Sequence, residues 1–140
     1  MEIIRGPIAE HERGVLEVLL RVDRLTLAKR RWRGVAEDGR EFGFDLAEPL
    51  DDGVAFFYSD GATYLIAQEP EPVLEISLGS PSEAARLAWL IGNLHFSFEI
   101  SGDVIRVAED PALRQMFIRE HVDFSEASHV FHPFGHGHVH

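Results

Sequence analysis

The chain of 140 residues contains no cysteine. This absence excludes disulfides, a thiolate metal site and a cysteine nucleophile. No apolar run is long enough to cross a bilayer, and the first fourteen residues lack the pattern of a secretory signal peptide. Together these absences predict a cytoplasmic protein with no membrane partner.

The sequence motifs of common enzymes are also missing. There is no glycine-rich nucleotide loop, no HExxH helix and no nucleophile elbow. Carboxylates are plentiful, but none of them stands in a recognisable acid–base arrangement. We therefore predict that the protein is not an enzyme.

Positive charge is scarce after residue 40. The net charge is -11, and residues 1–40 carry nine basic and seven acidic residues, so all of the excess negative charge lies in the remaining hundred. Such a surface repels phosphate backbones. The basic stretch Lys29–Arg33 could bind nucleic acid, but it also fits the solvated edge of a strand, and we predict no nucleic-acid partner.

Residues 1–70 are predicted to form a small β-domain. Short apolar runs alternate with turn signals, of which the clearest are Asp38-Gly39, Asp52-Gly53 and Asp60-Gly61. This spacing indicates a β-sandwich or a β-barrel. The expected strands span residues 15–20, 31–36, 41–46, 54–58 and 62–67. Trp32 could contact a partner, although packing inside this domain is the favoured interpretation.

Residues 71–130 are predicted to form a second domain, after a proline-containing linker at residues 69–72. Ser80-Pro81 and Asp110-Pro111 each start a helix, and Gly92 is expected to end the first one. Strands are expected at residues 73–78, 95–100, 104–107 and 122–130. The order of strand, helix, strand, strand, helix, strand predicts a ferredoxin-like βαββαβ fold, and so an α+β protein.

Histidines gather at the end of the chain. Six of the eight lie in the last twenty residues. Imidazole is a common ligand for transition metals, so residues 131–140 are predicted to be a flexible, metal-binding tail. An affinity tag is the alternative, although tags are usually uninterrupted histidine runs. The expected tail ligands are His132, His136, His138 and His140.

His95 stands apart from this cluster, directly after Gly92-Asn93-Leu94. A lone histidine is more often structural than a metal ligand, and one histidine cannot hold a metal by itself. Two copies could share an ion if a twofold axis brought them together. Composition alone leaves both interpretations open.

Several segments resemble the UreE family, the nickel metallochaperones of urease maturation. Gly92-Asn93-Leu94-His95 is similar to the family's glycine-asparagine-arginine-histidine motif. Four earlier segments match the family's first domain in order, and the resemblance covers essentially the whole chain. They are residues 25–27, 31–34, 38–44 and 50–53.

This resemblance implies a homodimer that holds Ni²⁺ between the His95 side chains of two chains, with the tail histidines completing or feeding the site. It implies delivery of the metal to the urease apoprotein with the help of the accessory GTPase, and a first domain used for protein contacts. Zn²⁺ or Cu²⁺ can substitute at imidazole sites. Two departures stand out: Leu94 replaces the motif arginine, and Glu109 and Pro111 flank Asp110 where some members carry auxiliary histidines.

Two other functions remain open from the sequence. The chain could be a protein-interaction module with an incidental histidine tail, or a general zinc or nickel buffer without a client protein. In the first case metal binding would be weak and would vanish with the tail.

Overall fold

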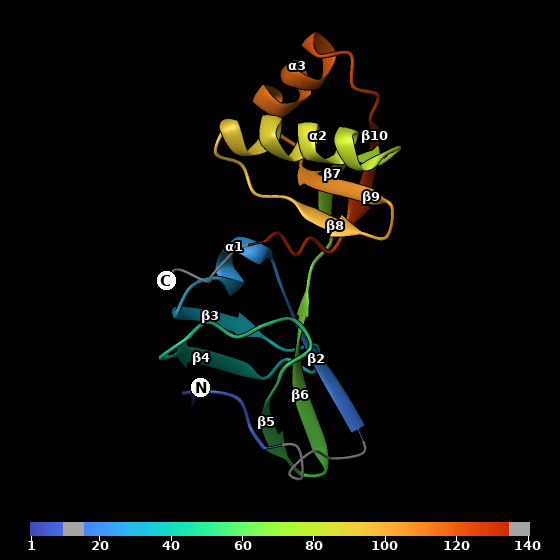
Figure 1. Ribbon diagram of the computed structural model, residues 1–140. Helices are drawn as coiled ribbons and strands as arrows, with labels where there is room; N and C mark the ends of the chain where they lie inside the picture. The colour runs from blue at the N-terminus through green and yellow to red at the C-terminus, as the bar shows by residue number, and fades with distance from the viewer. Residues whose placement is uncertain (10–15, 135–140) are drawn as a thin grey trace. The chain divides into compact units, whose positions relative to one another are not determined.

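The computed structural model describes residues 1–9 and 16–134, and strands outnumber helices in it, as expected for an α+β protein. The chain divides into two compact units, Met1–Glu69 and Pro70–His140 (Figure 1). Among the described residues, no helix has the length and apolar character needed to cross a membrane.

The first unit contains two three-stranded sheets. In one sheet β4 lies between β1 and β3, and in the other β6 lies between β2 and β5. The pairs β1–β4 and β2–β6 are parallel, while the other two pairs are antiparallel. The elements are β1 (Glu2–Ile4), β2 (Leu16–Val22), α1 (Arg24–Leu27), β3 (Arg31–Val35), β4 (Glu41–Asp45), β5 (Ala55–Ser59) and β6 (Ala62–Gln68).

Side chains from both sheets of the first unit share one apolar core. Aromatic rings dominate it, and the Phe42 ring contacts those of Phe56 and Tyr64 edge-on, with centroids 5.0 and 5.3 Å away. Trp32 stacks on Phe44 with ring centroids 3.9 Å apart and is only 8% exposed. Trp32 therefore packs inside the unit, as the favoured interpretation of the sequence held.

The three aspartate–glycine turns lie where the sequence predicts them. Gly39, Gly53 and Gly61 have φ angles of 90°, 82° and 81°. This left-handed region is open to glycine and costly for residues with a Cβ atom, so these glycines allow the chain to reverse. Two elements were not predicted, the three-residue strand β1 and the four-residue helix α1.

The second unit has the predicted order of strand, helix, strand, strand, helix, strand. Its four strands form one antiparallel sheet in the order β10-β7-β9-β8. Apolar side chains of β7, β9 and both helices form one core, with the two helices over the same face of the sheet (Figure 1). The elements are β7 (Glu71–Ser77), α2 (Pro81–Asn93), β8 (Glu99–Ser101), β9 (Val104–Ala108), α3 (Pro111–Arg119) and β10 (Ser125–His129).

Both helices begin as their sequences predict. The Ser80 hydroxyl accepts a hydrogen bond from the Glu83 N–H at 3.2 Å, and the Asp110 carboxylate accepts one from the Ala112 N–H at 2.8 Å. Each cap is followed by a proline, which has no N–H to leave unpaired in the first turn.

The structure corrects three boundaries of the second unit. Strand β7 already begins at Glu71 and includes Pro72, so the predicted linker shrinks to the Glu69–Pro70 junction. The strand expected over residues 95–100 is wrong before Glu99, because a turn occupies its first residues. The last strand is shorter than the predicted 122–130 and spans Ser125–His129.

Candidate metal centre

His95 lies immediately beyond the end of helix α2, in a tight turn. The helix ends at Asn93, and Leu94 is its C-cap. The His95 N–H donates to the Gly92 carbonyl at 2.9 Å, and the Phe96 N–H donates to the Ile91 carbonyl at 3.3 Å. This pair of bonds defines a Schellman motif, in which the residue after the C-cap is left-handed. His95 occupies that position with a φ angle of 66°.

Glycine is the residue usually found at this position, because a Cβ atom in the left-handed region costs about 1–2 kcal/mol. The sequence prediction that Gly92 ends the helix is therefore wrong. Gly92 is still helical, and the strained position is filled by a histidine three residues later. Strain of this kind persists where the fold or a function requires a particular side chain.

The His95 side chain is exposed to solvent, as are most of the residues just before it. His95, Gly92 and Asn93 are exposed, whereas Leu94 is half-buried and packs against the core of the unit. Leu94, which replaces the family's arginine, thus serves as an apolar anchor for the turn. Trp89, one turn before the end of α2, is 66% exposed.

The tail histidines fall into two groups. His136, His138 and His140 lie outside the described residues. His132 is exposed and lies between two buried residues, Phe131 and Pro133.

The part of the predicted tail that the structure describes is packed, which corrects the expectation that flexibility begins at residue 131. The backbone N–H of Phe134 donates to the Phe98 carbonyl at 2.8 Å. The two rings meet edge-on, with centroids 5.6 Å apart. This contact joins the last described residue to the segment between His95 and β8.

Within residues 1–9 and 16–134, no three histidine or carboxylate side chains are grouped so that they could hold a metal ion. His95 therefore belongs to no group of three potential ligands within the described part of one chain. A stable zinc or nickel site needs several ligands, so His95 requires further donors from another copy or another segment.

Glu109 and Asp110 both make contacts with the first turns of helix α3. Asp110 caps helix α3 through its carboxylate. Glu109 pairs with Arg114 at 2.8 Å, and Arg114 also pairs with Glu126 at 2.7 Å. Hydrogen bonds to Glu126 and Glu109 raise the pKa of Arg114 above its ordinary value. Where some family members carry auxiliary histidines, this chain thus has residues that cap α3 and form ion pairs with it.

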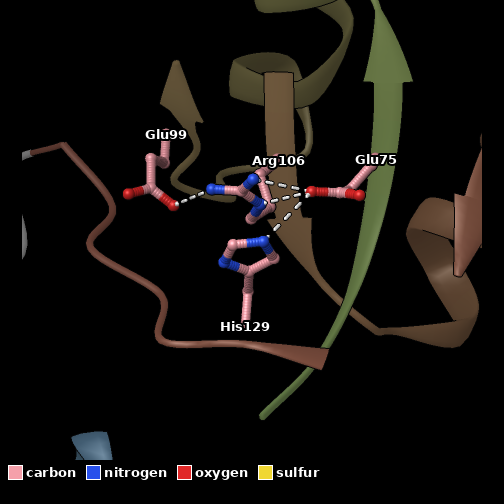
Figure 2. A network of polar contacts seen from close by, with 4 residues as sticks. All are labelled: Glu75, Glu99, Arg106 and His129. Atoms are coloured by element: carbon pink, nitrogen blue, oxygen red, sulfur yellow. Dashed lines mark hydrogen bonds and ion pairs between the residues drawn. The ribbon is translucent and has the colours of Figure 1, made fainter. Parts of the chain in front are cut away.

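A polar network with the buried Arg106 at its centre joins the four strands of the second unit (Figure 2). The Arg106 guanidinium, whose side chain is 8% exposed, pairs with Glu75 at 2.7 Å and with Glu99 at 3.1 Å. Burial by itself would lower the pKa of Arg106, but hydrogen bonds to the two carboxylates outweigh it and raise that pKa. The His129 Nε2 atom lies 4.0 Å from the Glu75 carboxylate.

The sequence analysis missed this network, although one signal for it was present. Gly102 and Asp103 connect β8 to β9, and this short connection sets Glu99 directly opposite Arg106. Opposite charges at facing positions of a hairpin stabilise the pair. The network fixes β8, the strand that follows the His95 turn.

The second unit is thus an α+β domain with an exposed, left-handed histidine just beyond the end of each helix, His95 after α2 and His121 after α3. Comparison with known proteins points to one family. The family model described as "UreE urease accessory protein, C-terminal domain" matches residues 71–140. The chain belongs to the UreE family of urease accessory proteins, which are not enzymes.

Individual relatives extend the similarity over both units. The urease accessory protein UreE of Paracoccus denitrificans (strain Pd 1222) is 35% identical over 127 residues, 86% of this chain and 78% of that protein. The UreE protein of Burkholderia ambifaria is 31% identical over 151 aligned residues, which cover all of this chain and 75% of that protein. The UreE protein of Nitrosococcus oceani is 30% identical over 118 residues, 80% of this chain and 71% of its own length.

Proposed function

We propose that this protein is a nickel metallochaperone that binds Ni²⁺ through His95 and delivers it for assembly of the urease active site. The observation that carries the proposal is His95 itself. It is exposed and held in a left-handed conformation at a helix end, inside the domain that matches the UreE family. A histidine in a position that favours glycine costs stability, which is understandable if the imidazole is needed there.

The proposed site is shared by two chains, each of which contributes His95. Apolar surface near His95 supports this arrangement. Trp89, six residues before His95 in helix α2, is 66% exposed, and tryptophan is enriched in the buried centres of protein interfaces. In an isologous dimer every residue near the axis occurs twice, so a single histidine per chain supplies two ligands.

Further ligands are proposed to come from His132, His136, His138 and His140. The contact between Phe134 and Phe98 supports this role, because it brings the start of the last six residues to the segment that follows His95.

The first unit is proposed to be a β-sandwich that contacts proteins of urease assembly, namely the urease apoprotein and the accessory GTPase. Its two sheets share a core and present exposed arginines around β3, which would suit acidic partners. We propose a cytoplasmic location, which suits a role in urease assembly. Zn²⁺ and Cu²⁺ are expected to compete with Ni²⁺, since imidazole ligands bind all three.

Nickel titration of metal-free protein by calorimetry tests the proposal. The wild type should show a tight site with fewer than one ion per chain. His95→Ala should lose that site, with affinity at least about a hundredfold lower, while a chain that ends at Phe134 should lose only weaker ions. Affinity should also fall between about pH 8 and pH 5, because protons compete for the imidazoles.

His121→Ala is the matched control, because His121 is also exposed and left-handed but ends the other helix. It should leave the tight site unchanged. If His95→Ala keeps tight binding, the proposed centre is wrong. If all binding disappears with the tail, the protein-interaction module with an incidental tail becomes the better explanation. Capture of urease from producing cells would separate a chaperone from a general metal buffer.

A further inference from the structure

We propose that a hollow beside the start of strand β3 binds a compact ligand that carries a di- or triphosphate group. Three consecutive cationic side chains, those of Lys29, Arg30 and Arg31, line this hollow of about 640 Å³ together with Asp45 and Leu46. All three cations are exposed. The hollow belongs to the first unit alone, so the proposal goes beyond the nickel site and involves no metal ion.

Backbone hydrogen bonds hold the segment that carries these cations. Residues 28–30 form the short connection between α1 and β3. The Lys29 N–H donates to the Thr26 carbonyl at 3.0 Å, and the Leu46 N–H donates to the Arg30 carbonyl at 2.9 Å. Leu46 is only 5% exposed and belongs to the apolar core of the unit. The three cationic residues therefore project from a backbone that is attached to α1 on one side and to the end of β4 on the other.

The carboxylate of Asp45 does not cancel the positive charge of the hollow. Its Oδ2 atom accepts from Arg5 Nη1 at 2.6 Å, and its Oδ1 atom accepts from Arg31 Nε at 3.2 Å. The second bond engages only Nε, so the two terminal amino groups of Arg31 keep their donors for a ligand. Within residues 1–9 and 16–134, the side chains of Lys29 and Arg30 have neither a hydrogen bond nor an ion pair. Four cations against one carboxylate leave a local charge of +3.

This set of donors suits a short phosphate chain better than a single carboxylate or a long polyanion. One arginine can match a carboxylate, whereas neighbouring phosphate groups carry several charges and many acceptor oxygens. Arginine binds phosphate bidentately, and lysine adds a point charge. The first unit, residues 1–69, holds nine basic and fourteen acidic residues, so a polyanion that extends beyond the hollow meets repulsive surface. A compact ligand avoids that repulsion.

Titration of metal-free protein with sodium tripolyphosphate and with ATP, in buffer without divalent ions, tests the proposal. Both probes should shift the amide NMR signals of residues 29–31, and adenosine, which has no phosphate, should not. The double variant Lys29→Gln, Arg30→Gln should bind tripolyphosphate about tenfold more weakly in calorimetry, because two charge-assisted contacts are lost. Equal affinity for the two probes would assign recognition to the phosphate chain alone, and tighter binding of ATP would identify a nucleotide as the ligand.

Arg33→Gln is the matched control, because Arg33 is exposed on the same strand, two residues after Arg31, but does not line the hollow. At about 0.15 M salt, screening should limit its effect to less than about twofold. Equal losses in the control and in the double variant would overturn the site, as would unchanged signals at residues 29–31. Tighter binding of polyglutamate or of a single-stranded oligonucleotide than of tripolyphosphate would also contradict it. Since no nickel is present, the outcome is independent of the titration that tests His95.

Discussion

Helices α2 and α3 have the same kinds of N-terminal and C-terminal caps, but the strands that follow them, β8 and β10, are held by different ion pairs. Each begins with an N-cap residue whose side chain accepts a hydrogen bond, followed by a proline. Each ends in a Schellman motif with a left-handed histidine, His95 after α2 and His121 after α3. The His121 N–H donates to the Ile118 carbonyl at 3.2 Å, the Val122 N–H donates to the Phe117 carbonyl at 2.8 Å, and φ of His121 is 57°.

The difference lies in the ion pairs that hold the following strand. Behind His95, strand β8 is tied to β9 by Glu99 and Arg106, whose side chain is 8% exposed. Behind His121, strand β10 is tied to α3 by Glu126 and Arg114, with side chains 62% and 31% exposed. Buried pairs are costly to break because the remaining charge loses its partner, whereas exposed pairs contribute little.

A strained histidine therefore does not mark a metal site by itself, since His95 and His121 share the same backbone setting. What distinguishes His95 is the contact of Phe98 with Phe134 and the partly buried ion-pair network of strand β8. A ligand that must be held in place benefits from a rigid strand next to it. Both turns carry the backbone strain of a left-handed histidine, but a role in metal binding is proposed only for His95.

The largest expected effect is at Arg106. Arg106→Ala should lower the free energy of unfolding of metal-free protein by about 3 kcal/mol, because the carboxylates of Glu75 and Glu99, with side chains only 22% and 15% exposed, would lose their charged partner. Arg114→Ala should cause a much smaller loss, since water can replace its contacts. Urea denaturation followed by circular dichroism measures both variants.

A neutral replacement of the whole network is the control for Arg106. The triple variant Glu75→Gln, Glu99→Gln, Arg106→Met should recover most of the lost stability, because it leaves no unpaired charge. If Arg106→Ala and Arg114→Ala lower the free energy of unfolding equally, the ion pairs of β8 and β10 contribute equally to stability, and the proposed difference between the two strands is wrong.

Local sequence signals predicted much of the fold but not the contacts around His95. The helix starts were predictable because a cap and a proline act within a few residues. The left-handed state of His95 was not, since Gly92 carries the stronger local signal for a helix end. The Phe98–Phe134 contact joins residues far apart in sequence, and no local pattern reports it. His95 itself was indicated by family resemblance rather than by its spacing.

The next effect concerns the strain shared by both turns. His95→Gly and His121→Gly should each raise the free energy of unfolding by about 1 kcal/mol, since glycine enters the left-handed region freely while its extra entropy in the unfolded state offsets part of the gain. Denaturation at one protein concentration in the presence of a chelator measures this. Nickel titration should then separate the two variants, because only His95→Gly loses the tight site.

Replacement by alanine provides the reference for these glycine variants. His95→Ala and His121→Ala keep a Cβ atom in the left-handed region, so each should remain close to wild-type stability. A glycine variant no more stable than its alanine counterpart would show that the turn carries no strain at that position. An increase at only one of the two positions would show that the turns differ in strain as well as in use.

The smallest expected effect is at the helix starts, where the two caps differ in charge. Asp110→Asn keeps an acceptor for the Ala112 N–H but removes the negative charge beside the positive end of the α3 dipole. It should lower the free energy of unfolding by about 0.3–1 kcal/mol at low salt, and less at 1 M salt because screening weakens the dipole interaction. Ser80→Asn, which changes no charge, should show no salt dependence. A salt-dependent loss for Ser80→Asn as well would mean that the caps act through something other than their charge.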